Sequence, residues 1–204
     1  IMKKLIRFLL IIILILSLLI IYARYGGTRG LITKEYQIET TIDDSFDGLK
    51  IVHFSDLHYL RITNKETTQS IIEEINLLNP DIVVFTGDLI DKDYKPNDKD
   101  ISNLKELLTS IKSKYGKYSV LGEHDIKVED TIKDIYISSN FTLLDNSYDV
   151  IYGNNNNKLF IGGLNNNPDI DKVMNYFTEN EDINYKIILV HEPDYTDTIT
   201  SKYN

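Results

Sequence analysis

Acidic and histidine side chains recur at four places in the sequence, each directly after an apolar run. These places read "DLH" (Asp56, His58), "GDLID" (Asp88, Asp91), "GEHD" (Glu123, His124, Asp125) and "VHEPD" (His191). Carboxylates and imidazoles are ligands that divalent ions such as Mn²⁺, Fe²⁺, Zn²⁺ and Mg²⁺ accept. The chain has no cysteine, so thiolate ligands and disulfides are excluded. If the four places meet in space, one shared carboxylate can bridge two ions.

The elements that would bring these side chains together follow one pattern. The apolar runs lie in residues 49–58, 80–91, 117–125 and 185–194 and have the composition of β-strands. Residues 64–79 and 100–116 carry isoleucine and leucine at helical spacing, with Asn64 as the predicted N-cap of the first helix and Gly116 at the end of the second. Alternating strands and helices predict an α/β fold with a largely buried sheet. Ligands of such sheets bind beyond the carboxyl ends of the strands, so the four clusters are predicted to share one edge.

Two further features lie outside this pattern. Residues 140–164 contain three short β-like runs separated by turn sequences, which predicts antiparallel strands or hairpins. His53 lies inside the first strand and matches none of the clusters, so a packed or capped imidazole is expected there.

The first thirty residues differ from the rest. Residues 5–22 are apolar apart from Arg7 and Ser17. As a helix they would reach about 27 Å, close to the thickness of a bilayer core. An uncleaved anchor is favoured over a cleaved signal peptide, because no small-x-small cleavage pair follows. The basic residues on either side favour a single-pass protein whose domain lies outside the cytoplasm.

Length and charge limit the number of domains and the class of partner. The predicted organisation is an anchor and linker over residues 1–30 and one domain over residues 31–204. The formal net charge of -9 opposes broad attraction to nucleic acid, and none is expected as a partner. An anionic substrate would need a local cation.

The four clusters, taken in order, resemble the motifs of the calcineurin-like metallophosphoesterases. That family has D-x-H, G-D-x-x-D, G-N-H-D, a lone histidine before x-P, and then G-H-x-H; the match here runs from about residue 49 to 194. The anchored N-terminus is similar to that of membrane-attached bacterial members. The resemblance implies a β-sheet sandwich flanked by helices and a dinuclear metal centre that hydrolyses phosphomonoesters or phosphodiesters.

Roles for the individual residues also come from the resemblance. Asp56 and His58 would bind one metal, Asp88 would bridge both, and Glu123 and His191 would bind the second. His124 would face the scissile phosphate as general acid or charge donor, with Asp125 orienting it. Asp91 would support the ligands without binding a metal itself.

Two departures from the family pattern bear on activity. Glu123 stands where the family has Asn, which leaves either a more negative working ligand or a lost site. No G-H-x-H block follows His191, so a fold incomplete at its C-terminus is expected, with a naturally shortened protein as the alternative. A membrane-tethered, catalytically impaired binding module is therefore the alternative to an enzyme. The membrane anchor favours a lipid-linked phosphoester as substrate.

Overall fold

The computed structural model describes residues 2–25, 31–183 and 185–203. The chain divides into two compact units, residues 1–39 and 40–204. The predicted division at residue 30 lies outside the described residues and stays a prediction. Unit 1 contains one helix, α1 (Met2–Tyr25), whose residues 2–22 are long and apolar enough to cross a membrane by length and composition.

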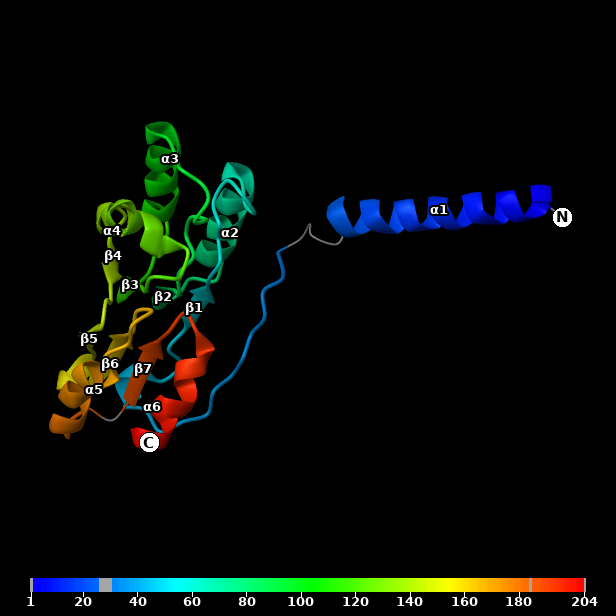
Figure 1. Ribbon diagram of the computed structural model, residues 1–204. Helices are drawn as coiled ribbons and strands as arrows, with labels where there is room; N and C mark the ends of the chain where they lie inside the picture. The colour runs from blue at the N-terminus through cyan, green and yellow to red at the C-terminus, as the bar shows by residue number, and fades with distance from the viewer. Residues whose placement is uncertain (1, 26–30, 184, 204) are drawn as a thin grey trace. The chain divides into compact units, whose positions relative to one another are not determined.

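Unit 2 is a sandwich of two sheets with helices on the outer faces (Figure 1). The first sheet has the order β1-β2-β3-β4, and all its pairs are parallel. The second has the order β5-β6-β7, with β5 and β6 antiparallel and β6 and β7 parallel. The strands are β1 (Ile51–Phe54), β2 (Ile82–Phe85), β3 (Gly116–Ser119), β4 (Phe141–Leu143), β5 (Ser147–Tyr152), β6 (Lys158–Gly163) and β7 (Tyr185–Leu189).

The helices cover the two sheets from opposite sides. The α-helices of this unit are α2 (Lys65–Leu77), α3 (Asp98–Thr109), α4 (Glu129–Ser138), α5 (Ile170–Glu179) and α6 (Thr196–Lys202). The short 3-10 turns are η1 (Asp44–Phe46), η2 (Asp125–Val128), η3 (Asn154–Asn156) and η4 (Pro193–Tyr195). Helices α2, α3 and α4 share an apolar cluster with the first sheet, whereas α5 and α6 share another with the second. A third cluster joins the facing sides of the two sheets.

The predicted α/β sandwich is therefore confirmed, with local differences. The side chain of Asn64 accepts a hydrogen bond from the backbone N–H of Thr67 and caps α2 as expected. The second predicted helix ends at Thr109, earlier than expected, and Gly116 instead begins β3. The run at 141–143 pairs parallel with β3, because α4 provides the crossover that parallel pairing requires. Only the β5–β6 pair within residues 140–164 is antiparallel as predicted. Helices α4 and α5 fall outside the predicted elements.

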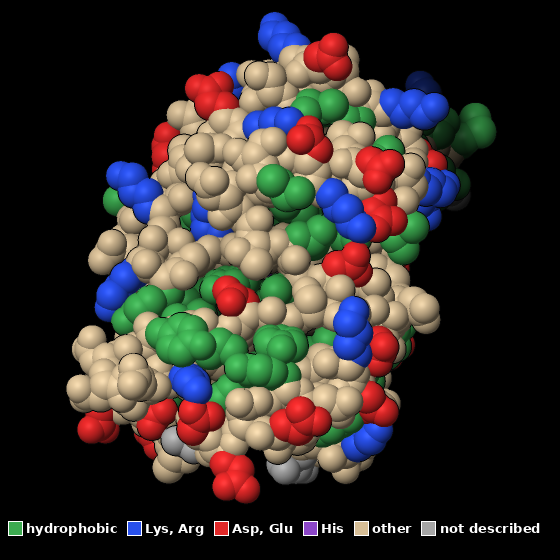
Figure 2. Space-filling model, turned by 90° about the vertical axis from the view of Figure 1, so that its left-hand side faces the viewer, with side chains coloured by type: hydrophobic (Ala, Val, Ile, Leu, Met, Phe, Trp, Pro, Cys, Tyr) green, Lys and Arg blue, Asp and Glu red, His purple; other side chains and the backbone are tan. Residues whose placement is uncertain are grey.

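Figure 2 shows one face of the molecule, with apolar side chains gathered in its lower half and charges of both signs scattered over it. Tyr148 and Tyr152 of β5 are among the exposed apolar residues. The ring of Tyr148 stacks on that of Tyr176 in α5, with the centroids 4.4 Å apart. This stacked pair belongs to the packing of α5 on the second sheet.

Candidate metal centre

The four clusters meet beyond the carboxyl ends of β1, β2, β3 and β7. Backbone bonds hold the first two loops together, since Asp56 N–H donates to Gly87 O at 3.0 Å and His58 N–H donates to Asp88 O at 3.0 Å. Asp56, His58 and Asp88 all have positive φ, at 55°, 38° and 60°. Non-glycine residues rarely adopt this conformation, and it commonly marks functional sites.

Two glycines let the second and third loops approach each other. A Cβ on Gly87 would lie 2.3 Å from the backbone nitrogen of Gly122, and one on Gly122 would lie 2.2 Å from Oδ1 of Asp88. Gly87 also has φ of +100°. Larger residues at either position would push the Asp88 and His124 loops apart.

Asp88 is the centre of the cluster. It is 3% exposed, and its carboxylate faces three imidazoles from three different loops. Oδ2 lies 3.5 Å from His58 Nε2 and 3.9 Å from His124 Nε2, while Oδ1 lies 3.7 Å from His191 Nε2. These spacings exceed a hydrogen bond and leave room for cations between the groups. The sequence expectation that Asp88 lies near both His58 and His191 is met.

Three overlapping groups could each hold a cation, with their ligand atoms within 4.8 Å of one another. They are Asp56 with Asp88 and His191, Asp88 with Glu123 and His124, and His58 with Asp91 and His124. All seven side chains are those that sequence reasoning singled out. The grouping differs from the expected one, because His191 lies with Asp56 and Glu123 lies with His124.

His191 has the protonation pattern of a metal ligand. Its Nδ1 lies 2.7 Å from the carbonyl oxygen of Thr86, which can only accept, so Nδ1 carries the proton. In the neutral ring Nε2 then holds the lone pair, and this atom faces Asp88. Histidines that bind metals commonly donate their other ring N–H in this way. The oxygen and imidazole donors of this centre therefore fit a divalent ion.

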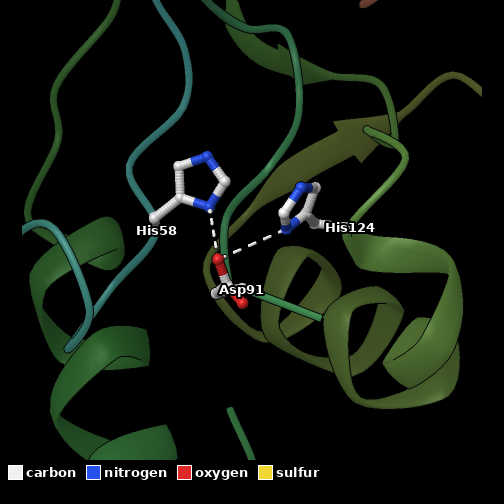
Figure 3. Close-up of side chains that lie close together, drawn as sticks. All are labelled: His58, Asp91 and His124. Carbon is white, nitrogen blue, oxygen red and sulfur yellow. Dashed lines mark ion pairs between the residues drawn. The ribbon is translucent and has the colours of Figure 1, made fainter. Parts of the chain in front are cut away.

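Asp91 lies between two of the imidazoles (Figure 3). Its Oδ2 is 3.5 Å from His58 Nδ1 and 3.4 Å from His124 Nδ1. Its Oδ1 accepts from Arg61 at 2.5 Å and from the backbone N–H of Asp93 at 3.0 Å. The Asp93 N–H holds the pKa of the Asp91 carboxyl below its usual value, and Arg61 acts in the same direction, while burial opposes both. Asp91 thus stays a carboxylate facing both rings.

Asp125 has different surroundings from those expected. It is 0% exposed, and its oxygens accept from the backbone N–H groups of Asp88, Leu89 and Gly122 at 2.9 to 3.0 Å and from Ile90 at 3.4 Å. Burial raises the pKa of its carboxyl to about 6, although these N–H donors favour the ionised form. The His124 ring instead faces Asp88, Asp91 and Glu123. Asp125 therefore braces the loops beneath the centre.

Glu123 and Asp56 are the solvent-facing members, with side chains 56% and 59% exposed. Glu123 Oε1 lies 3.7 Å from His124 Nε2. Of the expected packed or capped imidazole at His53, the structure shows the capped form: the residue is exposed in β1, its Nε2 lies 2.8 Å from Thr86 Oγ1, and partial burial of the ring lowers its pKa.

Arg61 is the residue at this edge that sequence reasoning missed. The signal available was a single cation three residues after His58, beside clusters that are otherwise acidic.

Comparison with known proteins shows which proteins this chain is similar to. Residues 49–203 match the model of the family described as calcineurin-like phosphoesterase. The chain is 33% identical over 182 residues to the uncharacterized metallophosphoesterase YkuE of Bacillus subtilis strain 168, covering 85% of this chain and 61% of the relative. It is 33% identical over 114 residues to the uncharacterized metallophosphoesterase Cj0846 of Campylobacter jejuni, covering 55% of this chain and 29% of that protein.

A third relative has a name that states a substrate. The UDP-2,3-diacylglucosamine pyrophosphatase LpxG of Chlamydia muridarum is 36% identical over 78 residues, which are 38% of this chain and 23% of that protein. The chain thus spans less than two thirds of the length of each of these relatives. The ordered acidic and histidine clusters, their convergence on Asp88 and the match over residues 49–203 together lead to one conclusion: the chain belongs to the calcineurin-like phosphoesterase family.

Proposed function

We propose that this chain is the catalytic part of a metal-dependent phosphoesterase that hydrolyses phosphomonoester or phosphodiester bonds with two divalent ions. The observation that carries the proposal is the buried Asp88 carboxylate, which faces imidazoles from three loops at 3.5 to 3.9 Å. Two ions beside one shared carboxylate would lower the pKa of a water and neutralise charge on the phosphate. Mn, Fe and Zn all suit these donors.

The ligand assignment follows the family resemblance, and contacts around Asp88 support part of it. Asp56, His58 and Asp88 would hold one ion, and Asp88, Glu123 and His191 the other. His58 Nε2 lies 3.8 Å from Asp56 Oδ1 and 3.5 Å from Asp88 Oδ2, which supports the first set. The Nε2 of His191, 3.7 Å from Asp88 Oδ1, supports His191 and Asp88 as members of the second. Since Asp88 belongs to both sets, its loss should affect both ions.

His124 is suited to proton donation. Its Nδ1 lies 3.4 Å from the Asp91 carboxylate, to which a protonated ring would donate from that atom. The backbone N–H of Lys92, 3.3 Å from the same atom, suits the neutral ring with its proton on Nε2. In either form Nε2 carries a proton, so it can donate to the leaving oxygen. We therefore assign the orienting role to Asp91, and to Asp125 the bracing of the loops.

The test compares Asp88→Asn with Asp134→Asn, a matched control on an exposed carboxylate paired to Lys105 on the surface. The natural polypeptide carrying these residues should hydrolyse simple phosphoesters when supplied with Mn²⁺. Asp88→Asn should weaken Mn²⁺ binding and abolish turnover, because a neutral amide is a poor bridge between two cations. Asp134→Asn should match wild type. Unchanged turnover in Asp88→Asn would contradict the two-metal assignment.

A binding module without turnover is the second candidate, and the exposed Glu123 in place of the family's Asn favours it. A longer, charged ligand would make the second ion a weaker Lewis acid. Comparing Glu123→Asn with wild type separates the two candidates. If the wild type is an enzyme, it turns over and the variant should keep or raise that turnover. If the wild type is an impaired module, it shows no turnover and the variant should gain it.

The substrate and location are inferred from the N-terminal helix and a relative. Helix α1 could anchor the chain, and similarity to LpxG supports a lipid-linked phosphoester. We place residues 31–204 outside the cytoplasm, as the basic flanks of the helix favour. Nucleic acid is not expected as a partner, because the net charge is -9 and positive side chains are scattered on the face in Figure 2. Protease added to intact cells should digest the domain; protection until lysis would reverse the orientation.

A further inference from the structure

Arg61 lies in a tight turn that is bonded directly to the His58 backbone. The N–H groups of Arg61 and Ile62 both donate to His58 O, at 3.0 and 2.9 Å. Leu60 N–H donates to Thr63 O at 2.6 Å and closes the turn. The position of the Arg61 backbone is therefore fixed relative to that of His58.

The side chain of Arg61 reaches the carboxylate of Asp91, which faces the Nδ1 atoms of both His58 and His124. Arg61 Nη1 lies 2.5 Å from Asp91 Oδ1, which leaves Oδ2 of the same group between the two rings. Rotation of the Asp91 carboxylate would carry Oδ2 away from both. Arg61 and the Asp93 N–H both oppose this rotation, since they hold the other oxygen.

The ring of His58 depends on the Asp91 carboxylate more than the rings of His124 and His191 do. Its side chain is 10% exposed, and Nδ1 has no hydrogen-bond partner within reach among the described residues. The acidic oxygen beside His58 Nδ1 is Asp91 Oδ2, at 3.5 Å. A small closure of that gap on metal binding would give His58 the carboxylate partner that metal-binding histidines commonly have.

The Arg61–Asp91 pair differs from an ordinary surface ion pair. The Asp91 side chain is 5% exposed, whereas that of Asp134, paired to Lys105 at the same 2.5 Å, is 63% exposed. An exposed pair contributes little, but removing one partner of a buried carboxylate leaves a charge uncompensated. Arg61 is thus the counter-ion of a buried group at the centre.

We propose that Arg61 is a positioning residue: by holding Asp91 it orients the ring of His58 for metal binding and the ring of His124 for proton donation. The inference rests on the proposed function, because it assigns Arg61 a part in the same centre.

The test uses Arg61→Gln, Arg61→Lys, Asp91→Asn and the matched control Lys105→Gln in the natural polypeptide, with Mn²⁺ affinity measured by titration. Changes that disturb the partners of metal ligands commonly cost about 10- to 100-fold in affinity or activity. Arg61→Gln should weaken Mn²⁺ binding about tenfold, Arg61→Lys should recover most of the loss, and Lys105→Gln should have no effect. Thermal unfolding of the metal-free proteins should be unchanged in Lys105→Gln, whereas Arg61→Gln and Asp91→Asn should unfold at lower temperature, because each breaks the pair at the buried carboxylate.

A second measurement distinguishes the loss of His124 orientation from a general loss of activity. Esters of nitrophenol need little proton donation to the leaving oxygen, whereas alkyl esters need it. Arg61→Gln should therefore lower kcat for alkyl esters several-fold more than for nitrophenyl esters. The double variant Arg61→Gln with Asp91→Asn should be no worse than Asp91→Asn alone, since Arg61 acts through Asp91.

The possible results separate this inference from the proposed function. If wild type binds Mn²⁺ and turns over, but Arg61→Gln has wild-type affinity or equal losses on both ester classes, the positioning role is wrong and the metal centre stands. Losses that add in the double variant also overturn it. If wild type neither binds Mn²⁺ nor hydrolyses any phosphoester, both proposals fail.

Discussion

Replacing Asp125 by Asn should destabilise unit 2, although the side chain keeps its size. Each oxygen of the carboxylate accepts from two backbone N–H groups: Oδ2 from Asp88 and Gly122, and Oδ1 from Leu89 and Ile90. An amide offers one oxygen only, so in either orientation its NH₂ group faces two N–H donors. Two buried N–H groups then lose their acceptor.

The size of the effect follows from those two bonds. Hydrogen bonds to a charged group contribute about 1.5 to 3 kcal/mol each, and relief from burying a charge offsets part of the loss. We expect the free energy of unfolding to fall by about 3 kcal/mol, which lowers the melting temperature by roughly 6 to 12 °C. Urea titration followed by circular dichroism measures this directly.

Asp134→Asn is the matched control, because that carboxylate is exposed and pairs only on the surface. Its free energy of unfolding is expected to fall by less than about 1 kcal/mol. An Asp125→Asn protein with the wild-type urea midpoint would refute the bracing role. If such a protein had also lost turnover, the original expectation that Asp125 orients His124 would be the better account.

Three further predictions concern the packing around the centre and the first sheet. Gly122→Ala should cost more than about 3 kcal/mol in urea titration or abolish Mn²⁺ binding, because its Cβ would lie 2.2 Å from Oδ1 of Asp88; a variant with wild-type values in both would refute this. Tyr136→Phe should be neutral or stabilise the fold by up to about 1 kcal/mol, since the buried hydroxyl has no partner among the described residues; a clear loss would reveal a hidden partner. Burial lowers the pKa of Lys117 to about 8 from 10.5, so the unfolded chain binds more protons between these values and the free energy of unfolding should rise with pH there. The rise should be at most about 3 kcal/mol and should vanish in Lys117→Met; an identical pH profile for the variant would contradict it.

The sequence by itself determined the framework and the members of the centre. Apolar runs that end in polar clusters specify buried parallel strands, and the carboxyl ends of such strands share one edge. Asp56, Asp88 and His191 could therefore be placed together before their distances were known. Asn64 could be placed as a helix cap because capping depends on the next three residues alone.

Only the tertiary structure decided which carboxylate lies beside which imidazole. The family resemblance paired Asp125 with His124, but at the start of the η2 turn the two consecutive side chains point in different directions. Asp125 points inward to backbone N–H groups, while His124 turns toward Asp91 from another loop. Arg61 and Asp91 are likewise thirty residues apart, and their contact exists only because β1 and β2 are neighbours in the sheet. Spacing along a strand or helix fixes local direction, whereas the partner across two loops depends on how the loops fold over the sheet edge.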